Sequence, residues 1–95
     1  MGEIDIVAYD GKDLAIVEVK TRNDYTDAEP NEWVTRDKQN KIIMTALSFV
    51  KEYEYTGNVR FDVIEVFIEK GKNHNGAKIN HIKNAFTTNE YFANI

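Results

Sequence analysis

The segment from Val59 to Glu69 constrains the fold of this chain more than any other. It carries a nearly continuous apolar run made of Phe61, Val63, Ile64, Val66, Phe67 and Ile68. Successive side chains of a β-strand point to opposite faces. A run without polar alternation therefore predicts a strand that is covered on both faces.

The residues before this run predict a helix that begins after Thr35 and ends near Tyr55. The Thr35 hydroxyl can accept a hydrogen bond from a free backbone N–H, and Asp37 is favourable in the positive first turn. Apolar residues follow helical spacing at Ile42, Ile43, Ala46, Leu47, Phe49, Val50 and Tyr53. A helix that lies on a sheet requires such a stripe.

Two further runs, Ile4 to Tyr9 and Leu14 to Lys20, predict an antiparallel hairpin because Asp10-Gly11 stands between them. Thr21 to Val34 is rich in Asn, Asp and Thr and predicts a loop. Strand, helix and strand in this order imply a parallel, right-handed crossover. The remaining predicted elements are a return strand and a helical turn, Lys78 to Ile82 and Thr88 to Ala93.

Length and composition predict one small α/β domain over residues 1–95. Hydrophobic residues make up 42% of the chain and charged residues 29%, as in ordinary soluble globular proteins. The absence of cysteine excludes disulfides and thiolate metal sites. No apolar run approaches the roughly 18 residues of a membrane span, and the amino terminus lacks a signal-peptide pattern, so we expect a cytoplasmic protein.

Three side chains of the predicted hairpin suggest a site. Glu18 and Lys20 share one face of their strand, and we expect Val17 and Val19 to take the opposite face, toward the core. Asp5 lies on the partner strand, across the hairpin. Glu3 shares the face of Asp5, so we expect three carboxylates and one ammonium to converge on one patch.

The spacing of these residues resembles the active-site signature of the PD-(D/E)XK nuclease superfamily. Asp5 is followed, after a gap of twelve residues, by Glu18-Val19-Lys20, while Ile4 replaces the proline of the signature. Longer motifs resemble the YraN family of predicted endonucleases, namely Gly2-Glu3-Ile4-Asp5, Val17-Glu18-Val19-Lys20-Thr21-Arg22, Lys38-Gln39 and Arg60-Phe61-Asp62-Val63. The resemblance implies a restriction-endonuclease-like mixed sheet with one crossover helix.

The same resemblance implies a Mg²⁺- or Mn²⁺-dependent nuclease that hydrolyses phosphodiester bonds of DNA, such as branched or processed intermediates. Asp5, Glu18 and the backbone carbonyl of Val19 would hold the ion, since hard oxygen ligands suit these metals. Lys20 would orient or activate the attacking water. Gln39, on the helix, would support the site or contact the substrate.

Four basic residues could contact nucleic-acid phosphates, namely Arg22, Arg36, Lys38 and Lys41. The net charge of −4 argues against a strongly basic binding surface, although a bound metal would supply part of the missing positive field. We therefore expect weak binding that does not depend on base sequence.

The chain departs from the YraN family at its amino terminus. Members usually begin with a helix and a further strand before the Gly-Glu-Ile-Asp motif, which starts here at residue 2. We therefore expect a domain that is truncated relative to the family and lacks this first helix and strand. Ile4 to Tyr9 would then form an unpaired apolar edge, which predicts a homodimer through this strand.

Other interpretations fit the same residues. A catalytically inactive nucleic-acid-binding or assembly module could retain the fold. A glycosidase could use Asp5 and Glu18 as acid and base, but it would leave Lys20 without a role. If these residues have no functional role, Glu18 and Lys20 form a surface ion pair and Glu3 is an ordinary exposed acid.

Overall fold

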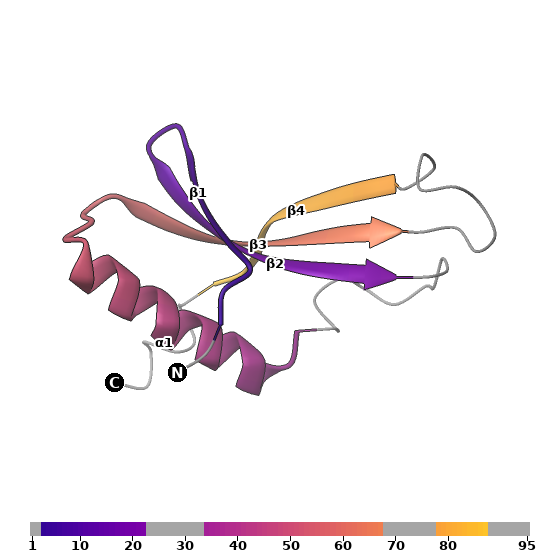
Figure 1. Cartoon of the computed structure of the whole chain (residues 1–95), viewed down its shortest axis with the longest axis horizontal. Helices are drawn as coiled ribbons and strands as arrows, with labels where there is room; N and C mark the ends of the chain where they lie inside the picture. Colours follow the sequence, from indigo (N-terminus) through magenta and orange to yellow (C-terminus); the bar gives the residue numbers. More distant parts are fainter. Residues whose placement is uncertain (1–2, 23–33, 68–77, 88–95) are drawn as a thin grey trace.

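One helix and four strands make up the part of the chain that the computed structural model describes, residues 3–22, 34–67 and 78–87 (Figure 1). In chain order the elements are β1 (Ile6–Asp10), β2 (Asp13–Arg22), α1 (Arg36–Glu52), β3 (Asn58–Phe67) and β4 (Lys78–Phe86). The strands form a single sheet in the order β1-β2-β3-β4. Only the β2–β3 pair is parallel, and α1 connects these two strands. The predicted mixed sheet with one crossover helix is confirmed.

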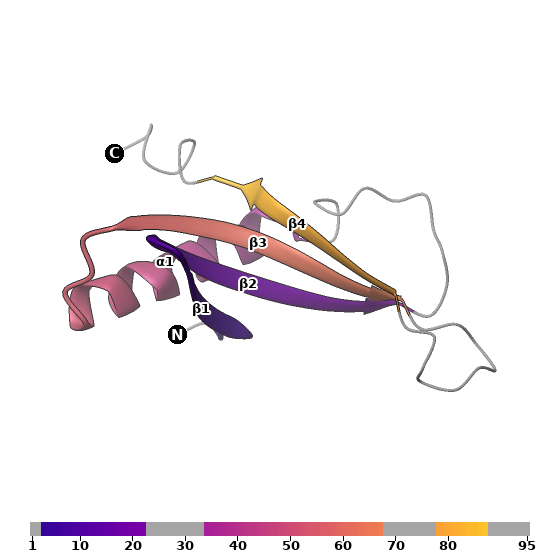
Figure 2. The same ribbon diagram turned by 90° about the horizontal axis from the view of Figure 1, so that it is seen from above.

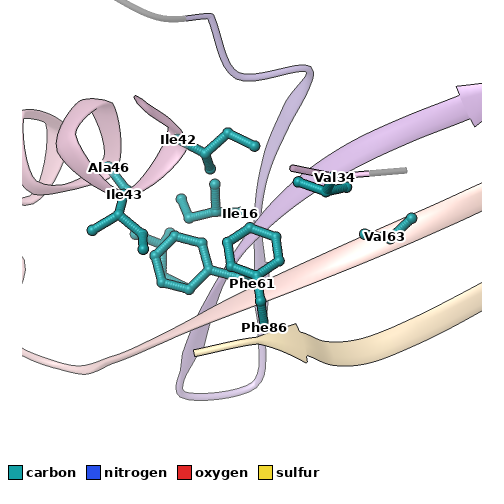
Figure 3. Packing of buried hydrophobic residues seen from close by; sticks show 9 residues of the cluster. Ile16, Val34, Ile42, Ile43, Ala46, Phe61, Val63 and Phe86 are labelled. Carbon is teal, nitrogen blue, oxygen red and sulfur yellow. The ribbon is translucent and has the colours of Figure 1, made fainter. Parts of the chain in front are cut away.

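The core lies between α1 and the face of the sheet that α1 covers (Figures 1 and 2). Its buried members are Leu14, Ile16, Val34, Ile42, Ile43, Ala46, Phe61, Val63 and Phe86 (Figure 3). The rings of Phe61 and Phe86 stack with their centroids 5.1 Å apart. Burying one large apolar side chain contributes roughly 1.5–3 kcal/mol, so this cluster is the main source of stability.

Both ends of α1 are closed by local hydrogen bonds. At the amino end, the Thr35 hydroxyl accepts from the Lys38 backbone N–H at 3.2 Å, as the sequence predicted. At the carboxyl end, the Tyr55 N–H donates to the Val50 carbonyl at 3.0 Å, and Glu54 takes a left-handed backbone conformation with a φ of 53°. The backbone N–H groups of residues 53–55 bond to carbonyls of the last helical turn, so the chain leaves the helix there. α1 therefore ends at Glu52, three residues before the predicted end.

Among the strand boundaries that lie within the described residues, three differ from the prediction by two residues or more. β1 begins at Ile6 instead of Ile4, because Asp5 bonds to β2 through its side chain instead of its backbone. β2 continues to Arg22 through residues predicted as loop, because it remains paired with β3 up to Phe67. β4 runs to Phe86, beyond the predicted end at Ile82, after a bulge in its pairing with β3. The helical turn predicted from Thr88 to Ala93 lies outside the described residues.

A buried charge network occupies the face of the sheet opposite α1. Asp62 is fully buried, and Arg60 donates to its two oxygens at 2.9 and 3.1 Å. His81 lies 2.7 Å from the same carboxylate, and the backbone N–H of Asn84 donates to it at 3.1 Å, across the bulge in β4. Arg60 also donates to Asp10 in β1 at 3.0 Å. Together, these contacts of Arg60 and Asp62 link β1, β3 and β4.

A hydrogen bond from Tyr55 holds the β1–β2 turn to the carboxyl end of α1. The Tyr55 hydroxyl lies 2.7 Å from the Lys12 carbonyl and 3.1 Å from that of Asn58. The ring of Tyr9 packs on that of Tyr55, with centroids 6.1 Å apart. The turn of the hairpin is thereby fixed to the helix at the end remote from Thr35.

β1 is an edge strand of this sheet, and all five of its residues are exposed. Ile6, Val7 and Tyr9 therefore present apolar side chains beside the outer backbone edge of the strand. Among the described residues, no helix has the length and apolar character needed to cross a membrane.

We predict that Asp62→Ala destabilises the protein by about 3 kcal/mol, because it leaves the Arg60 guanidinium without its main counter-charge and the Asn84 N–H without an acceptor. Urea unfolding followed by circular dichroism measures this change. Asp13→Ala is the matched control, since Asp13 is more exposed and lies 3.5 Å from Arg60. Its cost should stay under about 1 kcal/mol. Equal costs for the two variants would show that the Asp62 network is not structural.

Candidate active site

The register of β2 places Glu18 and Lys20 on the face that α1 covers. Glu18 is the Cα partner of Val63, a member of the core under α1. The expectation that Val17 and Val19 would take the core face is therefore wrong. Both faces of β2 are buried near its middle, since Val17 is also largely inaccessible, so alternation alone could not identify the face toward the helix.

The Glu18 carboxylate is buried, with 7% of its side chain exposed, and it pairs with two lysines. Lys38 Nζ lies 2.6 Å from Glu18 Oε1, and Lys20 Nζ lies 3.6 Å from the same oxygen. Lys38 comes from the first turn of α1, where the Thr35 cap fixes its backbone. The crossover helix therefore brings a third charged group to the predicted Glu18–Lys20 pair.

These contacts shift the pKa values of the two lysines in opposite directions. The hydrogen bond to Glu18 raises the pKa of Lys38 above its ordinary value. Contact with Lys38 lowers the pKa of Lys20, burial lowers it further, and the attraction of Glu18 offsets only part of this effect. Of the two lysines, Lys20 is thus the one that releases its proton more readily. A residue that activates water as a base must be able to lose its proton in this way.

Asp5 extends the β1–β2 pairing by a side-chain hydrogen bond. The regular ladder ends where Ile6 pairs with Val17, and the Val19 N–H then donates to Asp5 Oδ2 at 2.8 Å. The N–H and carbonyl of one strand residue point to the same side of the strand. The Val19 carbonyl therefore points toward the Asp5 side of β2, away from β3.

A pocket of about 250 Å³ opens where these groups meet. It is lined by Glu3, Asp5, Glu18, Lys38, Lys41 and Ile42. One water occupies about 30 Å³ of liquid, so the pocket has room for several waters or for a phosphate group. The acids of the hairpin and the lysines of the helix face the same space.

The donor set of this pocket fits a weakly held Mg²⁺ or Mn²⁺ ion. Mg²⁺ is commonly bound through one or two carboxylates together with waters and substrate phosphates. Asp5, Glu18 and the Val19 carbonyl provide oxygen ligands of this kind. Within the described ranges, no group of three or more Asp, Glu, His or Cys side chains is arranged around a common metal position. Asp5, Glu18 and the Val19 carbonyl would therefore need further oxygen ligands from substrate or solvent to hold such an ion.

The other predicted site residues are placed as follows. Gln39 Nε2 donates to the Val34 carbonyl at 2.8 Å and so anchors the residue before the helix cap. Lys41 lines the pocket and pairs with Asp37 at 3.3 Å. Arg36 is exposed at the first position of α1, and Arg22 is the last residue of β2. Of the four predicted phosphate contacts, the structure thus brings Lys38 and Lys41 to the pocket.

Sequence reasoning missed one buried acid beside the site. Glu65 in β3 is almost inaccessible, is the Cα partner of Lys20, and accepts a hydrogen bond from Asn80 Nδ2 at 2.9 Å. The only available signal was the parallel register of β2 and β3, because it is this register that sets Glu65 beside Lys20.

The fold and the pocket define a small α/β domain whose sheet and crossover helix enclose an acidic, lysine-bearing site. Residues 1–66 match the model of the uncharacterised protein family UPF0102. A UPF0102 protein of Clostridium botulinum strain Alaska E43 is 45% identical over 89 residues, covering 93% of this chain and 71% of that relative. A UPF0102 protein of Clostridium beijerinckii is 43% identical over 90 residues, covering 94% and 72%. The chain belongs to the UPF0102 family.

We predict that Lys20 reacts with an amine-acylating reagent at lower pH than Lys38 does, because only the neutral amine is nucleophilic and the pKa of Lys20 is the lowered one. Mass spectrometry of protein labelled over a pH series gives a midpoint for each lysine. Lys38→Gln removes the main cause of the lowered pKa and should move the Lys20 midpoint to higher pH. Identical midpoints for the two lysines in the wild-type protein would contradict this electrostatic description.

Proposed function

We propose that this chain is a metal-dependent nuclease domain with a PD-(D/E)XK active site, related to the YraN family of predicted endonucleases. The observation that carries the proposal is the hydrogen bond from the Val19 N–H to Asp5. It sets the aspartate of the motif beside Glu18 and Lys20, although its two partners are fourteen positions apart in the sequence. The mixed sheet and crossover helix agree with the restriction-endonuclease-like fold that the motifs imply.

The charged groups at the pocket and beside it on β2 have defined roles in this proposal. Asp5, Glu18 and the Val19 carbonyl hold Mg²⁺ or Mn²⁺, which when bound polarises a phosphoryl oxygen and increases the acidity of a water. Lys20 orients the attacking water and accepts or donates a proton at its Nζ. Lys41 and the ammonium of Lys38 lie at the same pocket and can offset phosphate charge.

We propose DNA as the substrate class, bound weakly through a small number of phosphates. The net charge of −4 leaves few cations for backbone contacts. A binding protein that neutralises few phosphates shows a shallow dependence of affinity on salt. The main alternative is a module that binds nucleic acid without cleaving it, which is favoured by the ion pair that already neutralises Glu18.

We predict that Asp5→Asn and Glu18→Gln each abolish Mn²⁺-dependent cleavage, and that Lys20→Met lowers its rate by about a hundredfold or more. A panel of single-stranded, duplex, flap and junction DNAs measures cleavage, while gel shifts measure binding. Asp37→Asn is the control, because Asp37 is 81% exposed on α1 and pairs only with Lys41 among the described residues. Metal-independent binding without cleavage by the wild-type protein would favour the inactive module and reject the nuclease.

We also propose that the chain forms a homodimer through β1, because the outer edge of this strand carries exposed Ile6, Val7 and Tyr9. An exposed apolar edge pairs readily with a second strand. We predict that Val7→Lys shifts the protein toward monomer in sedimentation velocity. Leu47→Lys is the matched control, since Leu47 on α1 is 39% exposed and Val7 is 37% exposed. A wild-type monomer at high protein concentration would reject the dimer.

A further inference from the structure

We infer that Lys38 acts as an internal substitute for the metal ion, so that its ammonium occupies the cation position beside Glu18 and must leave when an ion binds. Lys38 then regulates access of the ion to the site in addition to contacting substrate. This inference rests on the proposed function, because it concerns the same carboxylate. It adds a competition between Lys38 and the metal ion for Glu18, which the nuclease motif itself does not contain.

The geometry identifies Lys38 as the principal counter-charge of Glu18. A buried carboxylate without a partner is costly, so an acid as inaccessible as Glu18 needs a cation when no metal is bound. Lys38 Nζ is 2.6 Å from Glu18 Oε1, within hydrogen-bond distance, whereas Lys20 Nζ is 3.6 Å from that atom. A metal ion bound to this oxygen would meet the Lys38 ammonium at close range, and like charges exclude one another there.

Lys38 can leave this position without a change in the helix. Its backbone is held by the Thr35 cap, but its side chain is 43% exposed and ends in an ammonium on a flexible four-carbon stem. Rotation of the stem moves the charge away from Glu18 while the backbone stays in place. The released ammonium remains on the wall of the pocket, where it can form an ion pair with a substrate phosphate.

Lys41 provides an internal comparison because it lines the same pocket from the next turn of α1. Its ammonium pairs with Asp37 at 3.3 Å, and both of these side chains are mostly exposed. Lys41 thus contributes the same charge to the pocket as Lys38, but its ion pair is not with a proposed metal ligand. Removing each lysine in turn separates the specific contact from the general charge.

The test compares wild-type protein, Lys38→Gln and Lys41→Gln in Mn²⁺ titrations at constant ionic strength. Thermal melting measures the metal-induced stabilisation, and water-proton relaxation measures bound Mn²⁺ directly. We expect Lys38→Gln to melt at lower temperature than wild type without metal, because Glu18 keeps only Lys20. We also expect its half-maximal Mn²⁺ concentration to fall about tenfold, the size of one lost charged hydrogen bond. Lys41→Gln should leave that concentration unchanged.

Each outcome decides the inference. A wild-type Mn²⁺ response that Lys38→Gln leaves unchanged or weakens overturns the role of Lys38 but leaves the proposed nuclease standing. An equal tightening in Lys41→Gln also overturns it, because general pocket charge would then be the cause. A response that appears only in Lys38→Gln supports the inference. If none of the three proteins responds to Mn²⁺, both the role of Lys38 as a stand-in for the ion and the proposed metal site are rejected.

Discussion

The parallel pairing of β2 with β3 is the constraint on which the rest of the structure depends. Ten consecutive residue pairs join these strands, from Asp13 with Asn58 to Arg22 with Phe67. Parallel neighbours cannot be joined by a tight turn, so the chain must cross over the sheet, and α1 makes that crossing. The register then sets Glu18 beside Val63, at the face where Lys38 arrives from the first turn of the helix.

Buried carboxylates lie on both faces of the sheet, and Asp62 and Glu18 are compensated in different ways. Asp62 is surrounded by donors from β3 and β4, including a backbone N–H, and they hold its pKa below the ordinary value although burial alone would raise it. Glu18 is compensated by two flexible lysine side chains. Rigid donors suit a structural acid, whereas mobile cations suit an acid that exchanges partners.

Much of the fold could be predicted from local sequence. Asp10-Gly11 identified the hairpin, Thr35 identified the start of α1, and the apolar run in β3 identified an inner strand. The end of α1 could not be predicted, because it depends on Glu54 adopting a left-handed conformation that its residue type does not favour. The length of β2 could not be predicted either, since Arg22 stays in the strand through its pairing with β3.

The candidate site was predictable in its composition but not in its electrostatics. The spacing of Asp5, Glu18 and Lys20 indicated that these residues would meet, and the structure places them around one edge of β2. The pairing of Glu18 with Lys38 depends on where α1 crosses the sheet, which no local pattern gives. Glu65 escaped notice for the same reason, because only the register of β2 and β3 sets it beside Lys20.

The Tyr55 hydrogen bond to Lys12 has a consequence for motion within the domain. It ties the sheet to the carboxyl end of α1, whereas Glu18 and Lys38 meet near the amino end, roughly 25 Å away along a helix of this length. A small tilt of α1 about the tied end produces its largest displacement at the other end. If α1 tilted about Tyr55, the distance between the Lys38 ammonium and the Glu18 carboxylate would therefore be among the distances that change most.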